Sequence, residues 1–134
     1  MPSCGLWFRR NLLIAVILEH EGHSSAPLSF LRSEDGRRQL LAYLARHHGS
    51  SCQLVATEGL LRVDPIGELA VRDGLVVWSA PQLLIEAIRG VSGLAAGPPK
   101  RSALMLARLP SHPFFRPQLR HHAPPSDHRQ LPLL

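Results

Sequence analysis

Three short apolar runs constrain the fold of this chain more than any other feature of its sequence. They cover residues 12–18, 52–57 and 75–78, and each is too short for a buried helix, which indicates buried strands. Segments with the capping residues of helices lie between the runs. Repeated strand–helix–strand units need right-handed parallel crossovers, so the sequence predicts a layered α/β domain.

The start of the chain adds an antiparallel element to this sheet. Glu21-Gly22 is a turn signal, and the weakly alternating segment 27–31 has the pattern of a strand that pairs back on residues 12–18. The predicted sheet is therefore mixed, with an N-terminal antiparallel hairpin followed by βαβ crossovers.

Four helices are expected, and each has a recognisable start. The starts are a residue that can cap the helix or a proline that suits its first turn, namely Ser33, Asp64-Pro65, Pro81 and Ser102. Gly49 and Gly74 can end the first two helices, and the last helix is expected over residues 103–109.

The composition changes at Pro110. Residues 110–134 hold six prolines and four of the eight histidines, and they have almost no periodic apolar pattern. We therefore expect one folded domain over residues 1–109 and a disordered Pro/His-rich tail over residues 110–134. Phe114-Phe115 in this tail is expected to dock either on the domain's own surface or on a partner.

The cationic residues of the chain are almost all arginines. Lys and Arg number 15, of which only Lys100 is lysine, against 10 Asp and Glu, and the formal net charge is +5. Arginine binds phosphate in a bidentate manner, so nucleic acid or another polyanion is the first partner to consider. The alternative is that a GC-rich genome produces the arginine bias without any such partner.

The cysteines and the N-terminus indicate the compartment. Cys4 and Cys52 form neither a zinc motif nor a disulfide framework, and two scattered thiols are typical of a reducing cytoplasm. The apolar run 12–18 is too short to span a membrane and is followed by Glu19-His20-Glu21 without a cleavage site. We expect a cytoplasmic protein with no membrane partner, and a homo-oligomer is one possible state.

Several segments in succession resemble a known family. They are RRQLLAYL (37–44), LVATEG (54–59), VWSAPQ (77–82), GVSGLA (90–95) and KRSA (100–103). Their order and spacing are similar to those of the N-terminal, RuvC-like domain of the IS110-type (DEDD) transposases, over roughly residues 5–109. The resemblance implies an RNase H-like fold.

The same resemblance implies a chemistry that this chain lacks most residues to perform. The family consists of DNA recombinases that act with divalent metal held by four acidic residues, guided by a structured RNA where this is understood. The family's Glu corresponds to Glu58, whereas the three Asp positions fall on Trp7, Pro99 and Ser102. One carboxylate cannot hold two Mg²⁺ ions. The family's second, Ser-bearing domain also has no counterpart in these residues.

These departures lead to the expected function. We expect a degenerate, transposase-derived domain that binds DNA or structured RNA through an arginine-rich surface, without catalysis and without a cofactor. Three alternatives stay open: a residual metal-dependent nuclease or transposase that needs Mg²⁺, a protein-interaction domain, and a remnant without function.

Glu58 and Glu19 are the candidate carboxylates for residual catalysis. Glu58 follows the strand of residues 52–57, at the sheet edge where α/β proteins bind ligands. If residues 12–18 run parallel to that strand, Glu19 or Glu21 lies at the same edge, and two carboxylates there can bind a divalent cation. The alternative is that they are solvated turn and loop residues. The histidines show no spacing typical of zinc ligands, so no metal site is expected from them.

Four cationic residues are the candidate nucleic-acid ligands. Lys100 and Arg101 precede the last expected helix, where backbone N–H groups, the helix dipole and two cations would coincide. Arg37 and Arg38 lie on the first expected helix. The alternative for Lys100 and Arg101 is an ordinary loop stiffened by prolines.

Overall fold

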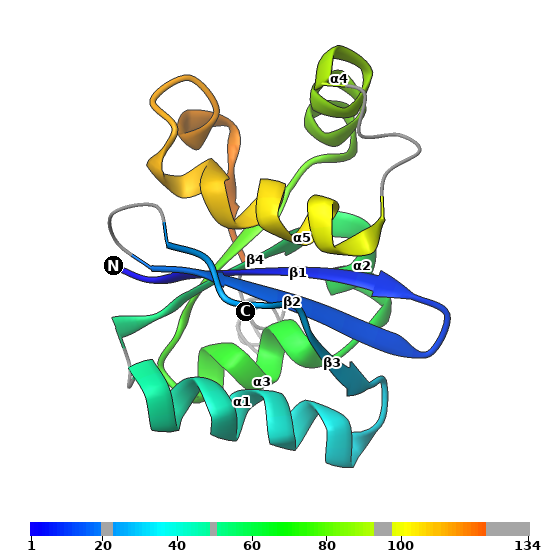
Figure 1. Cartoon of the computed structure of the whole chain (residues 1–134), viewed down its shortest axis with the longest axis vertical. Coiled ribbons are helices and arrows are strands. Elements are labelled where there is room, and N and C mark those ends of the chain that lie inside the picture. The colour runs from blue at the N-terminus through cyan, green and yellow to red at the C-terminus, as the bar shows by residue number, and fades with distance from the viewer. Residues whose placement is uncertain (20–22, 49–50, 93–97, 123–134) are drawn as a thin grey trace, which may run out of the picture.

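In the computed structural model, which describes residues 1–19, 23–48, 51–92 and 98–122, six strands form one mixed sheet (Figure 1). Their order across the sheet is β3-β2-β1-β4-β5-β6. The strands are β1 (Ser3–Arg9), β2 (Leu12–Leu18), β3 (Leu28–Leu31), β4 (Gln53–Thr57), β5 (Val76–Ala80) and β6 (Arg120–His121). The α/β class and the mixed sheet predicted from the sequence are confirmed.

The strand directions separate an antiparallel half of the sheet from a parallel half. β2 is antiparallel to both β1 and β3, so the predicted hairpin between residues 12–18 and 27–31 is confirmed. β4 is parallel to β1 and to β5. β1 is not among the apolar runs that the sequence analysis identified as strands, although the family resemblance aligns one Asp position with Trp7 inside it.

Helices cover both faces of this sheet (Figure 1). One face carries α1 (Glu34–His48), α2 (Glu58–Val63) and α3 (Ile66–Arg72), and the other carries α4 (Gln82–Ser92) and α5 (Pro99–Arg108). Alternate residues of a strand therefore enter different cores: Leu54 and Ala56 of β4 pack with α1–α3, and Val55 packs with α4 and α5. None of the helices in the described residues is long and apolar enough to cross a membrane.

Two of the predicted helix starts are confirmed by hydrogen bonds. The Ser33 Oγ accepts a hydrogen bond from the backbone N–H of Gly36 at 3.1 Å, at the start of α1. The Asp64 Oδ1 accepts one from the backbone N–H of Ile66 at 2.9 Å, at the start of α3. Gly74, with a φ of 87°, ends the second of these helices as expected.

The remaining helix predictions have mixed outcomes. The helix expected after Pro81 is α4. The helix expected to start after Ser102 begins earlier, at Pro99, and Ser102 is a buried residue inside it. The physical reason is that a proline suits the first turn of a helix, which makes the start signal here Pro99 rather than the hydroxyl of Ser102. Gly49, expected to end α1, lies outside the described residues.

The prediction of a disordered tail from Pro110 onward is wrong for residues 110–122. Two short 3₁₀ helices, η4 (Leu109–Ser111) and η5 (Arg116–Gln118), follow α5, and β6 then pairs antiparallel with β5. The domain therefore extends at least to residue 122. Residues 123–134 lie outside the described part of the chain.

Widely spaced side chains hold this segment on the domain. Leu119 is buried in the α4–α5 core, and Phe115 packs against the same core. The His121 ring lies against the Trp78 indole, with 4.1 Å between the ring centroids. Anchors at such irregular intervals produce no periodic pattern, which is why the sequence suggested disorder. Phe115 therefore docks on the domain's own surface, which is one of the two alternatives expected for Phe114-Phe115.

α5 lies directly on the backbone of β1. A Cβ atom on Gly5 would overlap the carbonyl oxygen of Ala103 and would stand 2.6 Å from the backbone nitrogen of Ala107. Only a glycine leaves room for so close an approach. Gly5 therefore determines how near α5 lies to the sheet.

The variant Gly5→Ala is expected to lower the free energy of unfolding by about 3 kcal/mol or more, because α5 has to move to admit the methyl group. Urea unfolding followed by circular dichroism measures this change. Gly59→Ala is the matched control, since nothing lies within 4 Å of a Cβ there and alanine favours the helix of α2. A Gly5→Ala protein as stable as the wild type would contradict the close packing.

Candidate nucleic-acid interface

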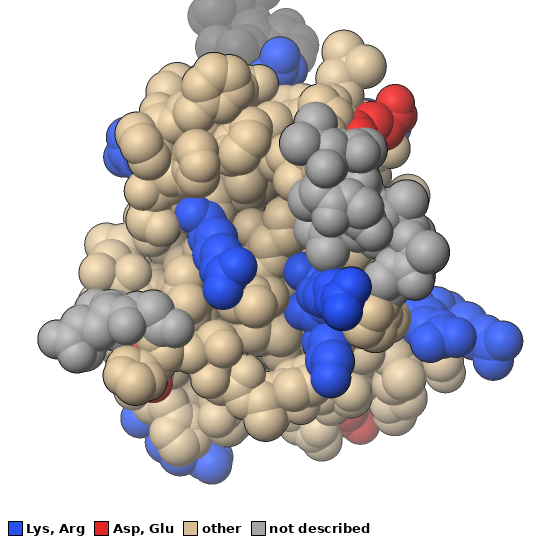
Figure 2. All heavy atoms as spheres, turned by 45° about the horizontal axis from the view of Figure 1, so that its top comes forward, with Lys and Arg blue, Asp and Glu red and all other residues tan. Residues whose placement is uncertain are grey.

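Positive charge is concentrated in one stretch of the chain. Between Glu86 and Asp127 the sequence contains no acidic residue. Within this stretch, the cationic residues whose side chains the structure describes are Lys100, Arg101, Arg108, Arg116 and Arg120. Figure 2, which brings the α4–α5 side of the molecule forward, shows several Lys and Arg side chains and few acidic ones. The fold therefore turns a charge asymmetry of the sequence into a basic side of the molecule.

Three of these cations project from α5. Lys100 and Arg101 lie in its first turn and Arg108 in its last, and all three residues are exposed. The opposite side of the helix consists of small and apolar side chains buried on the sheet. As far as the structure describes the chain, none of the three forms an ion pair with an acidic side chain. We call Lys100, Arg101 and Arg108 the α5 surface.

The position of Lys100 and Arg101 is unfavourable for the helix itself. They stand at the positive end of the helix dipole, and the first turn of α5 carries no acidic residue. A bound anion would interact favourably with both cations and with the positive end of the helix dipole. Backbone donors add little to the binding expected from the sequence, because Pro98 and Pro99 have no N–H and the Arg101 N–H donates to the Pro98 carbonyl oxygen at 3.0 Å. The geometry therefore keeps Lys100 and Arg101 as candidate phosphate ligands.

A groove of about 400 Å³ lies beside the α5 surface. Its walls come from α4, α5 and the segment around η4, and its lining residues are Ile88, Arg101, Leu104, Met105, Arg108, Leu109, His112 and Phe115. We call it the α4–α5 groove. Arg108 and His112 were not identified as candidates from the sequence, although the absence of acidic residues between Glu86 and Asp127 was a readable signal.

Arg37 and Arg38 lie in the other layer of the molecule, on α1, and both are paired with carboxylates. The Arg37 guanidinium contacts Asp64 at 3.3 Å, and the Asp64 side chain is only 1% exposed. Arg38 pairs with Glu34 at 3.1 Å and with Asp35 at 3.3 Å. The structure does not bring these two arginines to the α5 surface, and their charges are already compensated.

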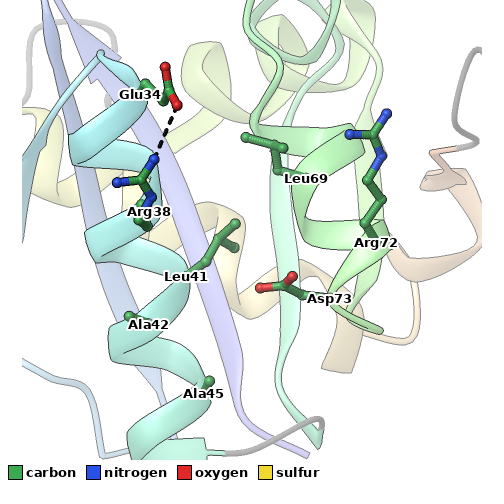
Figure 3. A pocket seen from close by; sticks show the side chains of 8 residues that line it. All are labelled: Glu34, Arg38, Leu41, Ala42, Ala45, Leu69, Arg72 and Asp73. Atoms are coloured by element: carbon green, nitrogen blue, oxygen red, sulfur yellow. Dashed lines mark hydrogen bonds and ion pairs between the residues drawn. The ribbon is translucent and has the colours of Figure 1, made fainter.

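A second groove separates α1 from α3, and its charges are balanced (Figure 3). Its floor is apolar, with Leu41 and Leu69 pointing toward each other from the two helices. Its rim carries two arginines, Arg38 and Arg72, and two acidic residues, Glu34 and Asp73. This mixture of signs does not favour a polyanion, in contrast to the rim of the α4–α5 groove.

Glu58 has a structural partner that the sequence does not reveal. It begins α2, whose cap is Thr57: the Thr57 Oγ1 accepts a hydrogen bond from the backbone N–H of Leu60 at 3.2 Å. The half-buried Glu58 side chain accepts a hydrogen bond from the backbone N–H of Gln82 at 2.9 Å. Glu58 therefore holds the N-terminus of α4, rather than lying free in a solvated loop.

The expectation that Glu19 shares a sheet edge with Glu58 is wrong. β2 is antiparallel to β1, whereas β4 is parallel to β1, so β2 runs opposite to β4. Ser3 pairs with both Leu18 and Gln53, which places Glu19 beside the start of β4. Glu58 follows the end of that strand, about 16 Å away at about 3.3 Å per residue. The two carboxylates therefore do not form one site, and Glu21 lies outside the described residues.

The positions aligned with the family's acids can also be located. β1 and β4 are parallel with Leu6 opposite Ala56, so Trp7 lies level with the end of β4, where Glu58 follows. Pro99 and Ser102 lie on α5. In the described ranges, no three His, Cys, Asp or Glu side chains come together in an arrangement that could hold a metal ion.

The two thiols are buried in the α1–α3 core. Burial raises the pKa of the Cys52 thiol from 9.0 to about 11. Burial, and to a lesser extent the neighbouring Cys52, raises the pKa of Cys4 well above 9.0. Thiols with raised pKa values are poor nucleophiles at neutral pH, so neither cysteine belongs to a candidate site.

No known protein family matches the chain, and no similar sequence is found among proteins of curated function. The fold and the geometry of the site are therefore the basis for proposing a function. The resemblance to the IS110-type domain remains a prediction from the segments in which it was observed.

Alkaline pH is expected to destabilise the folded protein through the buried thiols of Cys4 and Cys52. In the unfolded chain a thiol loses its proton near 9.0, whereas folded Cys52 keeps it up to about 11, so unfolding is favoured as the pH rises through this range. Full loss of the Cys52 contribution amounts to about 2–3 kcal/mol. Urea unfolding of wild type and Cys52→Ala across this range measures it, and the variant is expected to show the shallower fall. Identical pH dependence in the two proteins would exclude this effect.

Proposed function

We propose that this chain is a nucleic-acid-binding domain of the RNase H-like type that binds DNA or RNA without cleaving it. The observation that carries the proposal is the α5 surface: three exposed cations without acidic partners in the described structure, on a stretch free of acidic residues. Phosphate groups are the anions that such a surface can bind in number.

The topology supports the RNase H-like part of the proposal. An initial antiparallel part followed by parallel crossovers is the layout of that fold, and β1 to β5 have this layout. The family resemblance aligns two acidic positions with Trp7 and Glu58. Trp7 lies within β1, level with the end of the adjacent parallel strand β4, and Glu58 follows that end. Residues that hold one metal ion have to lie close together in the fold. The positions that the resemblance assigns to metal ligands satisfy this requirement for Trp7 and Glu58.

The side chains at those positions argue for binding without cleavage. Trp7 offers no metal ligand in place of the aspartate, and the Glu58 carboxylate accepts a hydrogen bond from the N-terminus of α4. A hard divalent cation needs several oxygen ligands. We infer that the domain keeps the fold of a nuclease-like ancestor and uses a basic surface to bind.

A charge-removal experiment tests the proposal. The triple variant Lys100→Gln, Arg101→Gln, Arg108→Gln is expected to bind labelled duplex DNA about tenfold to hundredfold more weakly in fluorescence anisotropy. The slope of log affinity against log salt concentration is expected to fall by about one for each phosphate that the variant no longer neutralises.

The matched control removes the same charge from the opposite layer. Arg38, Arg46 and Arg72 lie on α1 and α3, away from the α5 surface, and their triple replacement by Gln should leave binding nearly unchanged. Equal loss in both triple variants would show that only net charge matters and would overturn the assignment of the α5 surface. Cleavage of the DNA with Mg²⁺ that disappears in Glu58→Gln would overturn the claim of binding without catalysis.

A further inference from the structure

The α4–α5 groove combines an apolar floor with a cationic rim, and the basic surface alone does not explain that combination. We propose that the groove takes unpaired bases of a single nucleic-acid strand, while Arg101 and Arg108 bind the phosphates beside them. This inference rests on the proposed function and deepens it, because it states that the preferred ligand is single-stranded.

The floor of the groove is suited to the flat, weakly polar face of a base. Ile88, Met105 and Leu109 line it although little of their surface is exposed, and Leu104 is half-buried. The volume of about 400 Å³ lies within the range of about 300–1,000 Å³ typical of small-molecule sites. The groove is therefore large enough for a ring system.

Aromatic rings stand at one end of the groove. The His112 and Phe115 rings lie 4.5 Å apart between centroids, and the Phe115 ring meets the edge of Phe114 at 5.1 Å. The His112 Nδ1 accepts hydrogen bonds from the backbone N–H groups of Phe114 and Phe115, at 3.1 and 3.4 Å, which fixes the rings relative to each other. Stacking on such rings is a common way to bind single strands, since every base has a π-face.

The cations on the rim are placed for a backbone that passes along the groove. Arg101 and Arg108 are seven residues apart on α5, which is about two turns or about 10.5 Å along the helix axis. Both arginines line the groove, and none of its lining residues in the described part of the chain is acidic.

Only an unpaired strand offers the matching chemistry. A single strand presents a phosphate and an exposed ring in every unit, which complements a groove with arginines at the rim and apolar and aromatic groups inside. In a duplex the base faces are stacked on one another and cannot enter the groove. An acidic peptide would satisfy the arginines but would not supply a ring at regular intervals.

The test compares a labelled oligothymidylate with a duplex of the same length, in fluorescence anisotropy on the full chain. Phe115→Ala is expected to weaken oligothymidylate binding at least about fivefold, the lower limit for one stacked base, and to leave duplex binding unchanged. Phe114→Ala is the matched control, because Phe114 is 68% exposed and does not line the groove, and it should have little effect.

A second variant covers the case in which Phe115→Ala fails to fold. Leu104→Trp keeps Phe115 and fills the groove, so it should weaken oligothymidylate binding while the duplex still binds. Ala45→Trp places the same side chain in the groove between α1 and α3 and should change neither.

The outcomes separate this inference from the proposed function. Equal binding of duplex and oligothymidylate, both insensitive to Phe115→Ala and Leu104→Trp, would overturn the groove and leave the α5 surface standing. Polyglutamate that competes as well as oligothymidylate would also overturn it, because charge alone would then suffice. Absence of binding to either nucleic acid would overturn both.

Discussion

The contact between α5 and the backbone of β1 is the constraint on which the basic side of the molecule depends. Gly5 leaves no side chain between strand and helix, and the backbone of Ala103 and Ala107 occupies the space that a Cβ would need. A helix held this closely turns its small residues inward, so its long cationic side chains point to solvent. The α4–α5 groove, which has α5 as one wall, depends on the same contact.

The other layer of the sheet explains why the basic side is distinct. Asp64 is almost fully buried, and Arg32 and Arg37 contact the same carboxylate oxygen at 3.1 and 3.3 Å. A buried carboxylate without partners would be strongly destabilising, so these arginines have a structural task. Arg38 is likewise paired, although on the surface. Arg32, Arg37 and Arg38 on this side of the sheet are thus paired with carboxylates, whereas the α5 surface forms no ion pair within the described residues.

Local signals explain what the sequence predicted well. The apolar runs correspond to β2, β4 and β5, and the Ser33 and Asp64 caps begin α1 and α3, because these features depend on neighbours within a few residues. The structural features that were not predicted depend on contacts between residues that are far apart in the sequence. β1 is central because of its pairing on both sides rather than its own pattern, and β6 is ordered by contact with β5.

In the candidate site, too, residues marked by a local sequence pattern were predicted, and relations between residues far apart in the sequence were not. Lys100 and Arg101 were found from a local signal at a helix start. Whether Glu19 meets Glu58 depended on strand direction across three strands, which no local pattern encodes. The compensation of Arg37 likewise depends on Asp64, which is distant in the sequence.

Nucleic-acid binding at the α5 surface and the α4–α5 groove is tested most directly by ¹H–¹⁵N NMR. A DNA hairpin with a single-stranded arm is added to the full chain, and the amide chemical-shift changes are mapped on the structure. We expect the changes to be concentrated in α5 and in residues 109–119, with α1 unaffected. Changes confined to α1 and to the groove between α1 and α3, or no changes at all, would contradict it.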